Sequence, residues 1–140
     1  MYRHILLSFL SFHLFTFYQE IKSTDIVGKW TLTRHTITIK GKAIDKTPDK
    51  ISTYIFLLNG TYKLTDKVDN EIVESKGKWK LINKGGMVRL YNNVDIPDDP
   101  KVEIADHDLG IQFRNGKYYL IWSEWDVVDA PHKDYYEKSK

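Results

Sequence analysis

The sequence predicts an all-β protein, in which an antiparallel up-and-down meander forms a barrel or half-barrel of about eight strands. Short runs rich in β-branched and aromatic residues are separated by turn residues at intervals of about 8–15 positions, as in antiparallel sandwiches and barrels. No stretch of sufficient length has the period of an amphipathic helix. The tripeptide Gly-Lys-Trp occurs twice, at residues 28–30 and 77–79, as expected where an indole closes one end of a core.

Residues 1–19 have the plan of a secretory signal peptide, so the protein is predicted to be exported, to the periplasm or outside the cell. Arg3 and His4 form a charged tip, and the run from Ile5 to Tyr18 is apolar. A membrane-spanning helix needs about 20 apolar residues, which exceeds this run, so no membrane span is expected after signal removal. An uncleaved N-terminal anchor is the alternative.

Cleavage of the signal is expected after residue 19 or after residue 23. The predicted lipocalin-like domain, for which the reasons follow, then covers residues 24–130. Residues 131–140 are predicted to be a polar C-terminal tail or a short closing turn.

Composition excludes several classes of function. The chain has no cysteine, which rules out a thiol nucleophile, a thiolate metal site and structural disulfides. An exported chain without disulfides fits a bacterial envelope better than an animal extracellular space. The 21 basic and 19 acidic residues are interspersed, so no nucleic-acid partner is indicated.

The predicted strands follow the signal peptide in order. They cover residues 26–39, 51–58, 61–67, 71–82, 87–92, 101–105, 109–114 and 117–128. Residues 40–50 are polar and are predicted to form a long loop. In residues 93–100, two prolines exclude a central strand.

Turn residues predict the register of three hairpins. Asn115-Gly116 favours a two-residue turn that places Phe113 opposite Tyr118 and Ile111 opposite Leu120. A third hairpin is expected to close through residues 84–86, between Leu81 and Val88.

Asn59-Gly60 allows two registers. A two-residue loop would pair Leu57 with Tyr62, whereas a longer loop with Gly60 in the left-handed conformation would pair Phe56 with Tyr62. The longer loop is preferred because it gathers the large apolar side chains of both strands on one face.

The two Gly-Lys-Trp strands and the hairpin between them, Phe56-X-X-Asn59-Gly60-Thr61-Tyr62, resemble the small bacterial lipocalin-like domains over residues 24–92. This resemblance implies an exported calycin-type barrel with Trp30 at its closed end. Gly28, Trp30 and Gly77 are then structural residues of the barrel end. In full-size lipocalins a late-strand Arg packs across the Trp, but residues 117–128 contain no Arg.

The interior of an eight-stranded barrel is either filled by side chains or holds one small ligand. The predicted ligand-binding residues are the large inward-facing aromatics Tyr54, Phe56, Tyr62, Trp79, Tyr118 and Trp122. The leading hypothesis is a non-catalytic protein that binds a small hydrophobic or amphipathic molecule and needs no cofactor. The alternative is an envelope domain for protein interaction or structure, with these residues filling the core.

A protein partner is a second possibility at the outer face of the last predicted strand. Alternation places Tyr119 and Trp125 there as exposed aromatic residues. A helix, the C-terminal Tyr135-Tyr136 segment or a partner is expected to cover them, and the C-terminal segment is the preferred cover.

No pattern indicates catalysis or a metal. The three histidines after the signal peptide, His35, His107 and His132, lack metal-ligand spacing and are predicted to lie on the surface. Asp106-His107-Asp108 is interpreted as a solvated turn. Glu124 and Asp126 are interpreted as solvating acids, and no Gly-X-Ser-X-Gly elbow is present.

Overall fold

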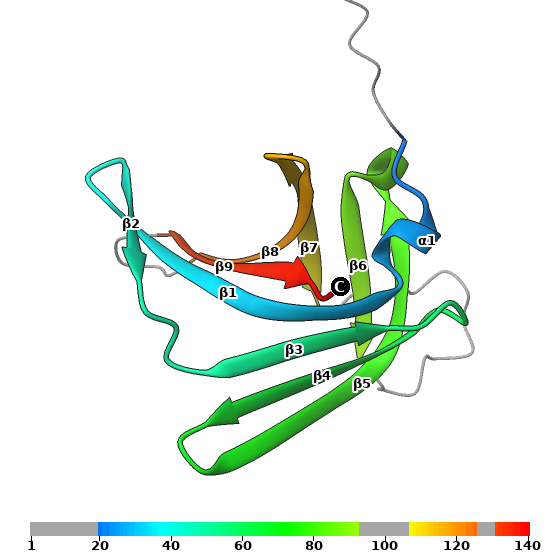
Figure 1. Ribbon diagram of the computed structural model, residues 1–140, viewed down its shortest axis with the longest axis horizontal. Coiled ribbons are helices and arrows are strands. Elements are labelled where there is room, and N and C mark those ends of the chain that lie inside the picture. Colours follow the sequence, from blue (N-terminus) through cyan, green and yellow to red (C-terminus); the bar gives the residue numbers. More distant parts are fainter. Residues whose placement is uncertain (1–19, 93–106, 126–130) are drawn as a thin grey trace, which may run out of the picture.

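The computed structural model describes residues 20–92, 107–125 and 131–140, with the side chains of residues 92, 124 and 125 excepted. Within these ranges it contains a four-residue helix, nine strands and one 3-10 turn (Figure 1). Their bounds are α1 (Ser23–Ile26), β1 (Gly28–Ile39), β2 (Lys42–Lys46), β3 (Ile51–Phe56), β4 (Thr61–Val68), β5 (Glu71–Ile82), η1 (Asn83–Gly85), β6 (Met87–Asn92), β7 (His107–Arg114), β8 (Lys117–Trp125) and β9 (Pro131–Lys138).

The strands form a closed antiparallel barrel. Each strand from β3 to β8 pairs with the next one along the chain, and β1 pairs with both β3 and β9. Eight strands therefore close on themselves, and β2 is an additional strand that pairs with the far end of β1. The predicted fold class is confirmed, as a full barrel rather than a half-barrel.

All three predicted hairpin registers are confirmed. Phe113 pairs with Tyr118 across Asn115-Gly116, and Leu81 pairs with Val88. At the ambiguous turn, Phe56 pairs with Tyr62, and Gly60 has the positive φ that the longer loop requires (82°). These registers place the large side chains of each hairpin on the inner face.

Residues 40–50, predicted to be a long loop, instead contain strand β2. Lys40 and Gly41 both have positive φ (50° and 75°), which suits a tight hairpin turn between β1 and β2. All five residues of β2 are exposed, so the strand carries no buried apolar alternation. The loop prediction was wrong because that alternation is the signal on which strand prediction depends.

The predicted C-terminal tail is also wrong, because residues 131–138 form strand β9. This strand pairs with β8 on one side and with β1 on the other, so it closes the barrel. Tyr136 is part of the buried core. The predicted strand 101–105 and the segment 93–100 lie outside the described residues.

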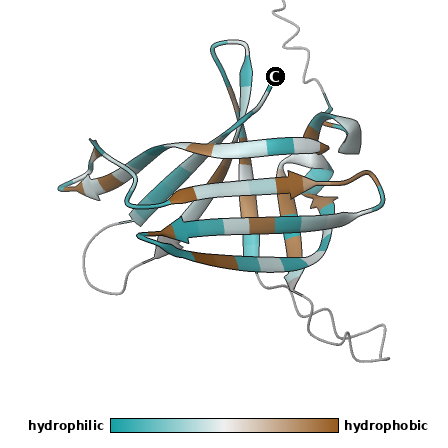
Figure 2. Ribbon diagram, turned by 60° about the horizontal axis from the view of Figure 1, so that its bottom comes forward, coloured by the Kyte–Doolittle hydropathy of each residue, from teal (hydrophilic) through white to brown (hydrophobic). Residues whose placement is uncertain are grey.

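One end of the barrel is covered by α1, next to the turns β3–β4, β5–β6 and β7–β8 (Figure 1). Brown and teal segments alternate along many strands in Figure 2, as expected when one face is buried. The buried core combines residues of α1, the early strands and β9. Within the described ranges, no helix is long and apolar enough to cross a membrane.

Candidate functional site

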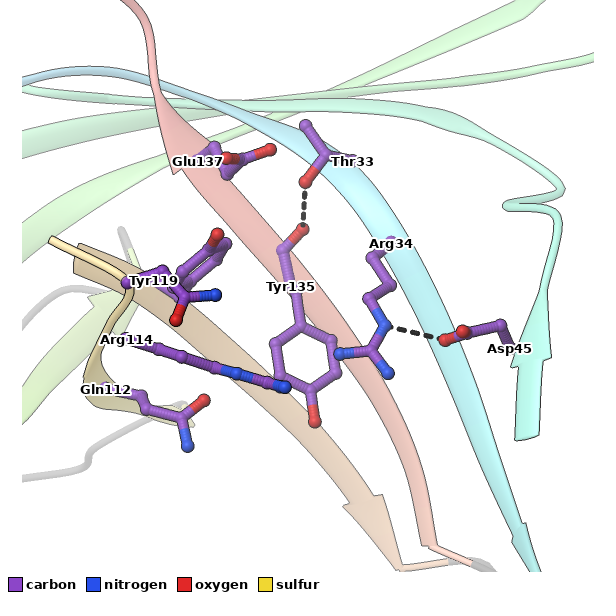
Figure 3. A pocket seen from close by; sticks show the side chains of 9 residues that line it. Thr33, Arg34, Asp45, Gln112, Arg114, Tyr119, Tyr135 and Glu137 are labelled. Carbon is purple, nitrogen blue, oxygen red and sulfur yellow. Dashed lines mark hydrogen bonds and ion pairs between the residues drawn. The ribbon is translucent and has the colours of Figure 1, made fainter. Parts of the chain in front are cut away.

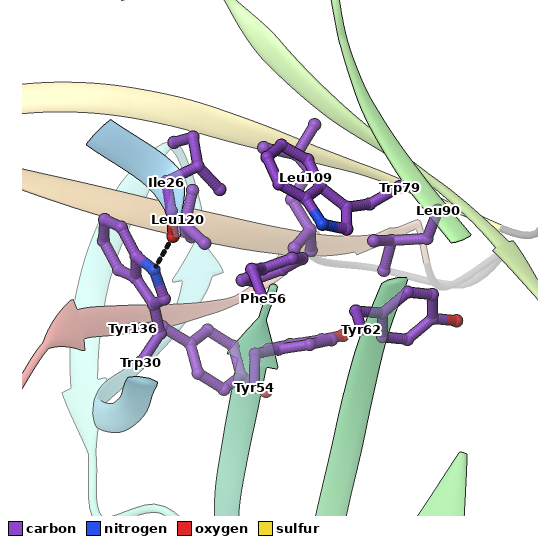
Figure 4. Packing of buried hydrophobic residues seen from close by; sticks show 11 residues of the cluster. Ile26, Trp30, Tyr54, Phe56, Tyr62, Trp79, Leu90, Leu109, Leu120 and Tyr136 are labelled. Atoms are coloured by element: carbon purple, nitrogen blue, oxygen red, sulfur yellow. Dashed lines mark hydrogen bonds between the residues drawn. The ribbon is translucent and has the colours of Figure 1, made fainter. Parts of the chain in front are cut away.

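The half of the barrel interior nearest α1 is filled by aromatic side chains (Figure 4). The Phe56 ring lies between its neighbours, with its centroid 5.5 Å from both Tyr54 and Trp79 and 6.2 Å from Tyr62. All four side chains are buried. These four predicted ligand-binding residues therefore form core packing, and ligand contact by them stays a prediction.

Trp30 closes this end as the resemblance implied. Its indole Nε1 donates a hydrogen bond of 2.7 Å to the carbonyl oxygen of Ile26 in α1. The Lys138 ammonium lies 5.9 Å from the centre of the indole ring and donates to the carbonyl oxygen of Asp25 (2.9 Å). A late-strand cation thus packs across the Trp, as Lys138 instead of Arg. The sequence prediction missed it because β9 was assigned to the tail.

Gly28 and Gly77 are at this end because no side chain fits there. A Cβ on Gly77 would lie 1.9 Å from the backbone oxygen of Tyr91 in β6. Gly28 has a φ of +135°, and its Cβ would lie 2.8 Å from Cε of Lys138. Gly77 thus permits the close approach of β5 and β6, whereas Gly28 provides a backbone conformation that other residues rarely adopt.

The opposite half of the interior is polar. The Ser52 hydroxyl donates to Oδ1 of Asp66 (2.5 Å), so it accepts from the Tyr136 hydroxyl 2.9 Å away. Burial raises the pKa of the Tyr136 hydroxyl, which keeps it protonated and available as this donor. Ser52, Asp66 and Tyr136 come from β3, β4 and β9, and all three point inward.

Three further residues, His35, Lys50 and Asp134, extend this network. His35 Nδ1 lies 2.6 Å from Oδ1 of Asp134. The Lys50 ammonium lies 3.6 Å from Oδ2 of Asp66 and 3.7 Å from Oδ2 of Asp134, so it links the two carboxylates. We call these six residues the inner polar cluster: His35, Lys50, Ser52, Asp66, Asp134 and Tyr136.

An irregularity in β1 is what brings His35 into the cluster. The pairing of β1 with β9 shifts by one residue at Thr33, as in a β-bulge, so Arg34 pairs with Tyr135 and His35 pairs with Asp134. Without the extra residue, Arg34 would stand opposite Asp134 on the inner face.

Aromatic rings lie beside the inner polar cluster. The Lys50 ammonium is 5.9 Å from the centre of the Trp122 ring, and the His107 ring stacks on Trp122 at 5.3 Å. The ring of His132 stacks on His35 at 5.7 Å. Trp122, one of the predicted ligand-binding residues, therefore lies next to the polar groups.

Solvent reaches this half of the interior. The side chains of His35, Lys50 and Asp66 are 24%, 26% and 26% exposed, although all three belong to the inner side of the barrel. Asp134, deeper in, is 6% exposed. The α1 end is therefore filled by side chains, whereas water reaches side chains in the opposite half, which we call the open half.

The predicted surface position of the histidines is wrong. His35, His107 and His132 are all partly buried and have ring or carboxylate partners. His35 in β1 and His132 in β9 occupy inward positions that alternate with outward ones. This alternation is recognisable only once both strands have been assigned. Among the described residues, no group of three or more His, Asp or Glu side chains could hold a metal ion.

Asp108 does not lie in a solvated turn, because it belongs to β7 and forms a two-pronged ion pair with Arg89 (2.8 and 2.9 Å). This contact lowers the pKa of the Asp108 carboxyl. Asp106 and Asp126 lie outside the described residues, as does the side chain of Glu124.

Tyr118, also a predicted ligand-binding residue, lies at the α1 end. It lines a groove of about 960 Å³ with Ile21, Ile111 and Phe113, between η1 and the β7–β8 hairpin. Phe113 is 62% exposed, so this groove presents apolar surface to solvent. Glu20, the first described residue, also lines this groove.

A second groove, of about 440 Å³, lies on the outer face of the barrel (Figure 3). Tyr119 lines it, as expected for an outward residue of β8; the side chain of Trp125 lies outside the description. The Tyr135-Tyr136 segment does not fold over Tyr119 as a cover. It continues the sheet, with Tyr135 in the groove and Tyr136 in the core.

Comparisons with known proteins give no match: no protein-family model matches the chain, and no curated protein sequence matches it significantly. The closed antiparallel barrel is compatible with the calycin-type fold. The lipocalin-like family itself stays a prediction.

Proposed function

We propose that this protein is an exported, lipocalin-like, non-catalytic binding protein, which holds a small amphipathic molecule in the open half of its barrel. The observation that carries the proposal is the inner polar cluster. It consists of polar groups on the inner side of the barrel that water can reach. Ligand sites combine apolar walls with a few converging polar groups, and this half offers both.

Charge selects the polar end of the ligand. Asp66 and Asp134 face a single ammonium, that of Lys50, and neither separation is as short as a charged hydrogen bond. Two carboxylates therefore converge on one ammonium in this cluster. A ligand amine or hydroxyl is therefore favoured over a carboxylate, because an anion would be placed beside two carboxylates in a region of low dielectric.

The apolar part of the ligand would lie against Trp122. Its indole is partly buried and packs against the core on one side. Leu64, paired between Tyr54 and Ser75 on the inner face, continues this apolar surface toward the aromatic half. The filled aromatic half sets the depth that a ligand can reach.

Native mass spectrometry of the protein purified from its own cells would reveal a bound small molecule. A second experiment measures displacement of the neutral fluorescent probe N-phenylnaphthylamine by dodecylamine and by dodecanoate. We expect dodecylamine to displace the probe at about tenfold lower concentration, a difference of about 1.4 kcal/mol. Equal displacement by both amphiphiles would refute the charge argument.

Two variants locate the site. Trp122→Ala should weaken probe binding about tenfold, whereas Phe113→Ser changes an aromatic residue in the groove at the α1 end and should leave binding unchanged. The reverse pattern would place the ligand in that groove and overturn the proposed site. Binding unaffected by either variant would exclude both.

Export is tested by the mass of the mature chain in a periplasmic or secreted fraction. A protein that begins at residue 20 or residue 24 would support signal cleavage. A full-length chain found in membranes would support the uncleaved anchor instead.

A further inference from the structure

The outer groove is lined by residues of β1, β7, β8 and β9, and by Asp45 of β2. Gln112 pairs with Tyr119, and Tyr119 pairs with Glu137, so these side chains form a row across β7, β8 and β9. The irregularity at Thr33 turns Arg34 outward, opposite Tyr135. The groove therefore depends on an extra residue in β1, and such bulges often re-aim side chains at functional sites.

Arg34 is held in place by β2. Its Nε donates to Oδ1 of Asp45 (2.6 Å), and its guanidinium carbon lies 4.9 Å from the centre of the Tyr135 ring. Asp45 binds Nε, and no hydrogen bond or ion pair joins the two terminal nitrogens of Arg34 to another described residue. Strand β2 is not needed to close the barrel, but its Asp45 orients the Arg34 side chain.

Arg114 approaches from the opposite side. In Figure 3 the Tyr135 ring lies between the side chains of Arg34 and Arg114. Arg114 is exposed, and no ion pair or hydrogen bond joins its side chain to another residue in the part of the chain that the structure describes. A second guanidinium is thus presented without a carboxylate of its own.

Hydrogen-bond donors predominate in the groove. Its two carboxylates have cationic neighbours, since Asp45 binds Arg34 and Glu137 lies 3.4 Å from the Lys117 ammonium. What remains are the guanidinium nitrogens, the amides of Gln112 and Asn115 and the tyrosine hydroxyls. Arg and Tyr are also the residues that most often anchor protein interfaces.

We propose that this outer groove binds an acidic segment of a partner protein, whose carboxylates are received by Arg34 and Arg114 while its apolar atoms lie on Tyr119 and Tyr135. The groove extends over the outer face of β1, β7, β8 and β9, which suits a chain lying across the sheet. This site is separate from the inner polar cluster, because its residues point to the other face of the same strands.

The test uses fluorescein-labelled heptapeptides with two adjacent glutamates among varied neighbours, each matched by a peptide with glutamines instead. Fluorescence anisotropy with the full-length protein should show binding of glutamate peptides that weakens as salt is raised. Arg114→Gln should weaken that binding about tenfold, since charged hydrogen bonds of this kind are worth about that much. Asp45→Asn, which releases Arg34, should weaken it less.

Lys78→Gln is the matched control. It makes the same change in net charge on an exposed residue of β5, away from the groove. An equal effect of Lys78→Gln and Arg114→Gln would reduce the result to overall charge and overturn the proposal. The proposal is also overturned if no glutamate peptide binds, if glutamine peptides bind equally well, or if acetate alone competes at the same concentration as the peptide.

Discussion

The two halves of the barrel interior differ although the same strands build both. In β3, Phe56 and Tyr54 belong to the aromatic half, and Ser52, two positions further, belongs to the inner polar cluster. Phe56 is fully buried, whereas the neighbours of Ser52 in the cluster include side chains that are about a quarter exposed. Stability is therefore concentrated at the α1 end, which leaves the open half able to hold polar groups.

The largest expected effect comes from tightening the aromatic half. Gly77→Ala would place a Cβ 1.9 Å from the backbone oxygen of Tyr91 and 3.0 Å from the Tyr62 ring, and the first of these distances is a severe steric clash. We expect a loss of about 4 kcal/mol or more, or failure to fold, because backbone has no room to yield in a paired sheet. Urea unfolding measures the loss.

Gly110→Ala is the control for this glycine, since its Cβ would have its nearest neighbour at 3.8 Å. It should be close to neutral. If the two substitutions have similar effects, the close approach of β5 and β6 is not what requires Gly77.

The second test compares one tryptophan from each half. Trp30→Ala removes a fully buried indole and should cost about 3–5 kcal/mol. Trp122→Ala removes a partly buried one and should cost about half of that. Thermal unfolding of both variants measures the two losses of stability. A larger loss for Trp122→Ala would contradict the conclusion that stability is concentrated at the α1 end.

The third test removes the central hydroxyl of the inner polar cluster. Ser52→Ala leaves Asp66 and Tyr136 without a shared partner and should cost about 1–3 kcal/mol. Ser75→Ala is the matched control on the inner face of β5, because the Ser75 hydroxyl has no hydrogen bond to another described residue. Tyr136→Phe combined with Ser52→Ala should cost less than the sum of the two, since both break the same bond.

The smallest expected effect is a pH dependence of stability that comes from the Arg89–Asp108 ion pair on the outer face. Arg89 lowers the pKa of Asp108 below its ordinary value of 3.8, so the pair adds stability above that pH. The contribution is lost as the pH falls through the folded-state pKa, where the carboxylate becomes protonated. Asp108→Asn should thus lower stability slightly at pH 6 and hardly at all at pH 2, as measured by urea unfolding. A larger difference at pH 2 would reverse the predicted sign.

The sequence predicts the aromatic half well because its signals are local. Asn-Gly turns and large apolar residues at alternate positions determine the register, as at Phe56 and Tyr62. The open half was missed for one physical reason. Strand β9 turns His132, Asp134 and Tyr136 inward, so it has no apolar alternation, and a strand whose buried face is polar resembles a tail.

The same reason concealed the candidate site. The carboxylate partner of His35 is Asp134, which is 99 positions away and belongs to the strand that was not predicted. The irregularity at Thr33, which decides whether His35 or Arg34 points inward, leaves no mark in composition or spacing. Trp122 was predicted as a ligand-binding residue because it is large and aromatic. The sequence did not predict the polar groups that lie beside it.

The pairing of β9 with β1 also determines when the barrel can form. The partners His35 and Asp134 are separated by 99 positions, and closing such a loop is slow compared with forming the hairpins between consecutive strands. During synthesis, the meander from β3 to β8 can assemble while β1 and β8 still have unpaired edges. Until β9 emerges and fills that gap, those edges can pair with other chains, so aggregation competes with folding at this last step.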